Sequence, residues 1–199
     1  IAASDGDSNI YYACHFLAGD PFIYLETGGE KTLLTTELEL GRARSEARVD
    51  RVVSTGPYEN KLRESGVVPK PTDILDLYLK EIGVTELVVP SSFPLGHAER
   101  LRAKGYSLEV RDDPFYPERI VKSPRELEWI AAAQKTTEEA MAFAIGRIAE
   151  SRIDGGTLRL GGEVLTAEKL QGEVRKMLLE RGYLATEIII AGGEQGCDP

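Results

Sequence analysis

Apolar positions in the first part of the chain follow two spacings in turn, one typical of strands and one of helices. Segments rich in β-branched and aromatic residues predict neighbouring antiparallel strands over 9–16, 21–25 and 31–35, with Gly28-Gly29 as the turn before the third. A helix is predicted from about Thr36 to Arg48, because Thr36 and Glu39 have the spacing of a capping box. A short strand is expected over 51–54.

The next segments repeat the order of helix and strand. Apolar residues at helical spacing predict helices over 72–82 and 94–104, which end at Gly83 and Gly105. Strands are predicted over 86–89, where the run of apolar residues indicates burial, and over 106–110. The connections include both hairpins and crossovers, so this region is expected to be α/β, with a mixed sheet and helices packed on it.

A proline-rich and acidic stretch, 112–117, then breaks the pattern and reads as a linker. The domain boundary is placed after it, which gives domains 1–121 and 122–199. Ser123-Pro124-Arg125-Glu126 has the form of a capping box with proline at the first helical position. The helix predicted from there to about Glu150 keeps one apolar face, made of Leu127, Ile130, Ala131, Met141, Ile145 and Ile148.

The remaining segments predict a hairpin, a helix and a buried strand. The hairpin over 157–165 turns at Gly161-Gly162, and the helix runs over 167–181. The apolar run 187–190 predicts a buried strand that leads into a glycine turn. Because the chain stops soon afterwards and begins at Ile1 without Met, it is expected to be a region of a longer protein.

Charge and composition exclude several classes of function. The net charge is −9, from 24 basic and 33 acidic residues, and no basic face is present for a nucleic acid. No apolar run approaches the roughly 18 residues of a membrane span, and no signal peptide is recognisable. Cys14 and Cys197 lie far apart and form no disulfide framework, which favours a reducing cytoplasm.

The chain lacks the usual catalytic motifs. His15 and His97 are its two histidines, and neither has a partner at metal-ligand spacing. His97 is expected at the surface or as a cap near a helix start. The glycines after residue 191 do not continue into the Walker pattern or the dinucleotide fingerprint, and a nucleophile elbow is absent. No catalytic or metal-binding residue is therefore predicted within residues 1–199.

The order of features resembles the creatinase, aminopeptidase P and prolidase family, peptidase family M24. Asn9-Ile-Tyr-Tyr with Phe16 resembles the start of the family's N-terminal domain. The phrase Lys122-Ser-Pro-Arg-Glu-Leu-Glu-Trp-Ile-Ala-Ala-Ala133 is similar to the helix that opens its catalytic domain, and residues 182–199 are similar to the next strand and glycine turn. The hairpin over 157–165 departs from the family's short Pro-Gly turn at this place.

The resemblance implies an N-terminal creatinase-like domain with a ribonuclease H-like fold, over 1–121. It implies that 122–199 is the first, truncated part of the α+β pita-bread catalytic domain. The expected activity of the full-length protein is hydrolysis of Xaa-Pro peptide bonds, as an aminopeptidase or a dipeptidase. Two divalent metal ions are implied, manganese first and cobalt or zinc as alternatives, with all their ligands after Pro199. The segment alone is expected to be inactive.

The resemblance also implies which residues of this segment lie near a substrate. The loop with His15, Phe16, Gly19 and Asp20 is the candidate for restricting the active site to short proline-containing peptides. The alternative is that Phe16 belongs to the core and His15 is simply exposed. Gly192 and Gly193 are the candidate turn that approaches the active site. A homodimer is expected from the family, with neither nucleic acid nor membrane as partner.

Two other functions stay open at this stage. The first is a metal-free binding module that keeps the fold, and the second is a creatinase-like amidinohydrolase that acts without metal. The residues that separate these functions from the peptidase are expected downstream of the segment, since function depends on the site and not on the fold.

Overall fold

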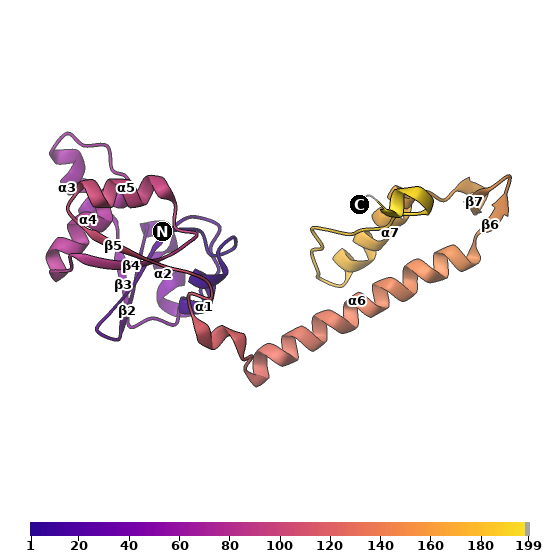
Figure 1. The fold of residues 1–199 in the computed structure, drawn as a ribbon, viewed down its shortest axis with the longest axis horizontal. Helices are drawn as coiled ribbons and strands as arrows, with labels where there is room; N and C mark the ends of the chain where they lie inside the picture. Colours follow the sequence, from indigo (N-terminus) through magenta and orange to yellow (C-terminus); the bar gives the residue numbers. More distant parts are fainter. Residues whose placement is uncertain (198–199) are drawn as a thin grey trace. The chain divides into compact units, whose positions relative to one another are not determined.

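The computed structural model describes residues 1–197, and the chain divides into two compact units, Ile1–Val121 and Lys122–Pro199. Figure 1 shows the elements of each unit along the chain. In the described residues no helix is both long and apolar enough to cross a membrane.

The first unit is α/β. Its helices are α1 Ser8–Cys14, α2 Glu37–Glu46, α3 Gly56–Glu64, α4 Pro71–Ile82, α5 Leu95–Ala103 and the 3₁₀ helix η1 Pro117–Ile120. Its strands are β1 Ile23–Thr27, β2 Glu30–Thr35, β3 Arg51–Ser54, β4 Glu86–Pro90 and β5 Ser107–Arg111. Helix α3 was not predicted, although Pro57 lies at its first turn and Gly66 follows its end.

The strands form a mixed sheet and a separate parallel pair. β1 and β2 are antiparallel, and the turn between them uses positive φ at Gly28 and Gly29. β3 pairs with β2 in parallel, and β4 pairs with β5 in parallel. The mixed α/β class predicted from the sequence is confirmed, but the strands are divided between two sheets. In β4, Val89 alone is buried, so this strand is less buried than its apolar run indicated.

Two apolar clusters lie on opposite faces of the first sheet. Neighbouring residues of a strand point to opposite faces, so Leu33 and Leu34 enter different clusters although both are fully buried. Leu34 packs in the cluster built mainly by α4, α5 and Tyr106. Leu33 packs in the cluster formed by Cys14, Phe16, Ala18, Phe22 and Ala43. The α1 end and the loop after it therefore belong to the core of this unit.

The strand predicted over 9–16 is wrong, because residues Ser8–Cys14 form helix α1. The Asp7 side chain caps this helix by accepting hydrogen bonds from the backbone N–H groups of Asn9 and Ile10, at 2.9 and 3.0 Å. The cap and the tertiary contacts of this short segment outweigh the β propensity of its aromatic and β-branched residues. The capping box expected at Thr36 is also not formed, since its side chain makes no capping hydrogen bond.

The described part of the second unit, residues 122–197, contains two α-helices, a 3₁₀ helix and a small sheet. Its elements are α6 Pro124–Glu150, β6 Arg152–Asp154, β7 Thr157–Leu160, β8 Glu163–Val164, α7 Ala167–Glu180 and the 3₁₀ helix η2 Gly193–Cys197. The capping box of Ser123 and Glu126 is confirmed, as is the hairpin at Gly161-Gly162. β6 was not predicted, and it joins β7 through a second glycine turn at Gly155-Gly156.

The strand predicted over 187–190 is wrong within the described residues. Ile188 and Ile190 pack against the core of α6 and α7, while Ile189 is exposed, so the alternation of a strand is retained. A strand also needs a hydrogen-bonded neighbour, and none of the strands described in residues 1–197 pairs with this segment.

Candidate functional site

The candidate loop begins where α1 ends at His15. His15 has φ 51°, in the left-handed region that ends many helices, and its backbone N–H donates to the Tyr11 carbonyl at 2.7 Å. The imidazole is partly exposed, with its centroid 6.0 Å from the Tyr11 ring and 6.3 Å from the Tyr12 ring. The helix end therefore turns the chain sharply and places an imidazole beside two tyrosines.

Phe16 anchors the loop in the core. Its side chain is fully buried, and its ring meets Phe22 edge to face with centroids 5.7 Å apart. The guanidinium of Arg42 lies over the same ring, 5.2 Å from the centroid. Of the two interpretations for Phe16, the structure places it in the core, so it holds the loop and does not itself present a surface to a ligand.

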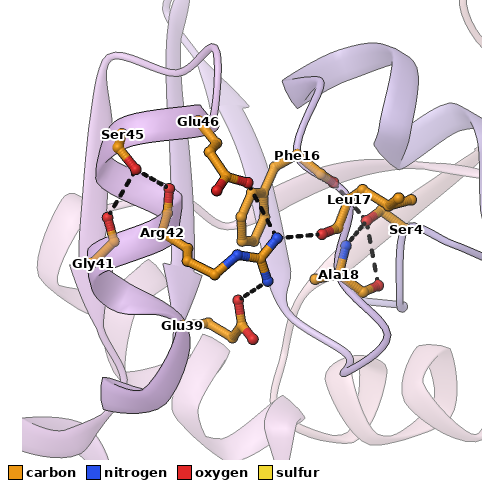
Figure 2. Close-up of polar contacts among 9 residues, drawn as sticks. All are labelled: Ser4, Phe16, Leu17, Ala18, Glu39, Gly41, Arg42, Ser45 and Glu46. Atoms are coloured by element: carbon orange, nitrogen blue, oxygen red, sulfur yellow. Dashed lines mark hydrogen bonds and ion pairs between the residues drawn. The ribbon is translucent and has the colours of Figure 1, made fainter.

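Ser4 fixes the backbone on one side of the loop. Its hydroxyl donates to the Phe16 carbonyl at 2.6 Å and accepts from the Ala18 N–H at 2.8 Å (Figure 2). The Ser4 N–H in turn donates to the Ala18 carbonyl at 3.1 Å. Ser4 is itself buried, so these bonds are shielded from water.

Arg42 of α2 fixes the loop on the other side. Figure 2 shows its guanidinium between the loop and two carboxylates, donating to the Leu17 carbonyl at 3.1 Å, to Glu39 at 2.7 Å and to Glu46 at 3.1 Å. The hydrogen bond to Glu46 is the main cause that raises the pKa of Arg42. With Phe16 buried and the Leu17 carbonyl held, the loop presents the side chains of Leu17 and Asp20, and the Gly19 backbone, to solvent.

The segment before Val121 packs against α1. The Tyr116 ring lies 5.6 Å from that of Tyr12, and the Arg119 guanidinium lies over Tyr12 at 5.8 Å. Arg119 also donates to the side-chain oxygen of Asn9. Burial is the main cause that raises the pKa of Tyr116 to about 12. Asn9 and Tyr12, two residues of the motif on which the resemblance rests, thus join α1 to residues more than a hundred positions away.

The other predicted positions lie in the second unit. Gly192 is exposed and precedes η2, whose first residue, Gly193, has a positive φ of 62°. The two candidate sites therefore belong to different units.

The described residues do not fit a metal centre. Within residues 1–197, no three His, Cys, Asp or Glu side chains gather closely enough to hold an ion. His97 lies in α5, and its Nδ1 is buried without a hydrogen-bond partner among the described residues; burial lowers the pKa of this imidazole. Cys14 is buried, which raises the pKa of its thiol.

The chain has a creatinase/prolidase-like fold, as the sequence resemblance implied. The chain is 30% identical over 149 residues to the Xaa-Pro dipeptidase of Pyrococcus horikoshii. This match covers 72% of this chain and 37% of that protein. The prolidase from Pyrococcus furiosus has a similar structure, with TM-score 0.63 and 19% identity, over 88% of this chain and 43% of that one.

The X-Pro aminopeptidase from Thermotoga maritima is also similar in structure. Its TM-score is 0.67 at 15% identity, and the match covers 90% of this chain and 45% of that one. No protein-family model matches the chain. The chain thus spans less than half the length of these relatives, and the similarity corresponds to the N-terminal part of the two solved structures.

Proposed function

We propose that this chain is the N-terminal portion of a proline-specific metallopeptidase, an Xaa-Pro aminopeptidase or Xaa-Pro dipeptidase. The observation that carries the proposal is the 30% identity over 149 residues to an Xaa-Pro dipeptidase, together with a fold that extends over both units. Residues 1–121 then form the creatinase-like domain, and 122–199 the first part of the catalytic domain. The metal ions, with manganese expected first, belong to sequence outside residues 1–199.

In this proposal, residues 1–199 restrict the substrate and contribute to a homodimer, in the cytoplasm. The restricting element is the loop from His15 to Asp20, whose core anchor is Phe16. Three features support a restricting role: an imidazole beside two tyrosines, an exposed Leu17, and a backbone held from both sides by Ser4 and Arg42. A loop fixed in this way excludes longer peptides at little entropic cost, because it is ordered before the substrate binds.

The test is to express the complete open reading frame and assay it on Xaa-Pro peptides with and without manganese. Manganese-dependent release of the N-terminal residue supports the peptidase. Metal-free hydrolysis of a guanidino substrate such as creatine, with no cleavage of Xaa-Pro peptides, would contradict it in favour of an amidinohydrolase-like reaction. Absence of turnover with manganese, cobalt or zinc would contradict it in favour of a binding module.

His15→Asn is the sharpest test of the restricting loop. Asparagine tolerates the left-handed backbone of this position, so the variant removes the imidazole and keeps the turn. We expect KM for Xaa-Pro dipeptides and tripeptides to rise about two- to tenfold with kcat unchanged, the effect of one lost contact that is equal in ground and transition states. His97→Asn is the matched control and should leave KM as it is. Equal KM values for His15→Asn and the unmodified enzyme would remove His15 from the site.

A further inference from the structure

Helix α1 is too short to be stable alone, so its position depends on contacts with other elements. It has seven residues, and its buried positions, Ala13 and Cys14, both lie at its C-terminal end. Its first turn is held by the Asp7 cap and by Arg119, which donates to the side-chain oxygen of Asn9. The two ends of α1 are therefore fixed by different parts of the first unit.

A row of aromatic rings runs from the end of α1 to the segment that follows β5 and passes beside this helix (Figure 1). The His15 imidazole lies 6.3 Å from the Tyr12 ring, which lies 5.6 Å from that of Tyr116. Tyr116 meets Phe115 edge to face at 5.1 Å, and the Arg111 guanidinium lies 5.4 Å from the Phe115 centroid. We call the four rings from His15 to Phe115 the α1 row.

Tyr12 has the central place in the α1 row. Its ring contacts both the His15 imidazole and Tyr116, and the Arg119 guanidinium lies over it, 5.8 Å from the centroid. Aromatic pairs and cation–π pairs favour particular ring orientations, so these contacts are directional. The side chain is partly buried and does not belong to the enclosed core. Tyr116 and Arg119 therefore restrict the rotamer of Tyr12 from outside α1.

The backbone of the candidate loop is held by a different set of contacts. Ser4 and Arg42 bind backbone groups of residues 16–18, and the Phe16 side chain is buried in the core. These contacts fix the course of the chain, but they leave the rotamer of the His15 side chain open. The ring contacts with Tyr11 and Tyr12 restrict that rotamer.

We propose that Tyr12 is a positioning residue, which sets the orientation of the His15 imidazole and is itself held in place by Tyr116 and Arg119. The inference rests on the proposed function, because an oriented imidazole restricts peptides only if His15 lies at the substrate. The alternative is that the α1 row only stabilises α1. In that case the loss of one ring lowers stability and leaves the imidazole in its orientation.

The histidine resonances of the product of the complete open reading frame test the positioning role directly. The protein carries isotope-labelled histidine, and His15→Asn and His97→Asn assign the two signals of this segment by their disappearance. Tyr116→Leu removes one ring of the α1 row, and Tyr116→Phe is the matched control, since it keeps the ring. His97 lies in α5 of the same unit, so its signal reports whether the unit stays folded.

We expect Tyr116→Leu to shift or broaden the His15 signal, because a reoriented imidazole meets different ring currents from Tyr11 and Tyr12. Tyr116→Phe should leave the His15 signal in place, and the His97 signal should stay unchanged in both variants. Arg119→Gln takes the charge off the Tyr12 ring by a smaller change, and it decides the question if the His97 signal also moves in Tyr116→Leu. An unchanged His15 signal in the folded variant would overturn the proposal.

A double-mutant cycle on Xaa-Pro tripeptides tests the kinetic consequence. We expect Tyr12→Leu to raise KM about two- to tenfold with kcat unchanged, and to add less than about twofold in the His15→Asn background, because both changes remove the same contact. Tyr12→Phe restores the ring and should return KM to within about twofold of the unmodified enzyme. Fully additive effects of Tyr12→Leu and His15→Asn would overturn the positioning role.

The two measurements separate this inference from the proposed function, because the histidine signals are read without any substrate. A His15 signal that responds to Tyr116→Leu, in a protein that cleaves no Xaa-Pro bond, would contradict the proposed function and support the positioning of the imidazole. Cleavage of Xaa-Pro peptides by a protein whose His15 signal ignores the α1 row would do the reverse.

Discussion

Replacing Asp76 by alanine is expected to lower the free energy of unfolding of the first unit by about 2 to 3 kcal/mol. The Asp76 carboxylate is 7% exposed and accepts a hydrogen bond from the Tyr106 hydroxyl at 2.8 Å. It also pairs with Lys80 at 3.0 Å and Lys104 at 3.3 Å. Removing it leaves the Tyr106 hydroxyl with only a 3.2 Å bond to the residue 76 carbonyl. The lysines reach water, which keeps the loss below that of a fully buried pair.

Urea unfolding followed by circular dichroism measures this loss, with Asp73→Ala as the matched control. Asp73 lies in the same helix and pairs with the same Lys104 at 3.0 Å, but it is 16% exposed, and the Tyr106 hydroxyl bonds to Asp76 instead. Its replacement should cost at most about 1 kcal/mol. Equal losses for the two variants would mean that the Tyr106 contact does not contribute.

The contribution of Asp76 should also depend on pH in a defined direction. Burial alone would raise the pKa of this carboxyl, but hydrogen bonds from Lys80, Tyr106 and Lys104 lower it below its ordinary value of 3.8. A lowered folded-state pKa means that the stabilisation is complete above the unfolded value and is lost as pH falls through the folded one. The stability difference between the unmodified chain and Asp76→Asn should therefore stay constant down to about pH 5 and shrink below it.

Phe16→Ala is expected to destabilise the first unit by about 3 to 5 kcal/mol, since it empties a fully enclosed aromatic site. It removes both the edge contact with Phe22 and the ring under Arg42. Phe16→Leu refills most of the volume and should cost distinctly less. Thermal or urea unfolding of the two variants gives the comparison.

Leu17→Ala is the control for Phe16, because Leu17 is the next residue and 58% of it is exposed. Its replacement should change stability by no more than about 0.5 kcal/mol. If Phe16→Ala were equally mild, the loop would not be anchored through this ring, and the proposed rigidity of the site would lose its main support.

Most elements were predictable from the spacing of apolar residues and from local stop signals. Gly83 and Gly105 end their helices in the left-handed region, and the Ser123 capping box begins α6 as predicted. The strand prediction for 9–16 failed because it rested on the β-forming residues and left out a local helix signal in the same sequence, Asp7 at the N-cap position.

The contacts that shape the candidate site were beyond such reasoning. Arg42 reaches the Leu17 carbonyl from a different element, and Arg119 reaches Asn9 across 110 positions. Neither contact follows a helical or strand period, so no spacing in the sequence indicates it. Helix α6 is a related case, because the spacing of its apolar residues did not indicate that α7 packs on the face that carries Ala140.

The two glycine turns of the β6–β8 sheet make this hairpin a practical attachment point. Gly155, Gly156, Gly161 and Gly162 are exposed, and a Cβ added at any of them would meet no atom within 4 Å. Exposed turns tolerate insertion far better than the elements they join. A fluorophore-binding peptide or an affinity tag, flanked by short glycine linkers that retain the positive φ, is best inserted here, away from the α6–α7 core.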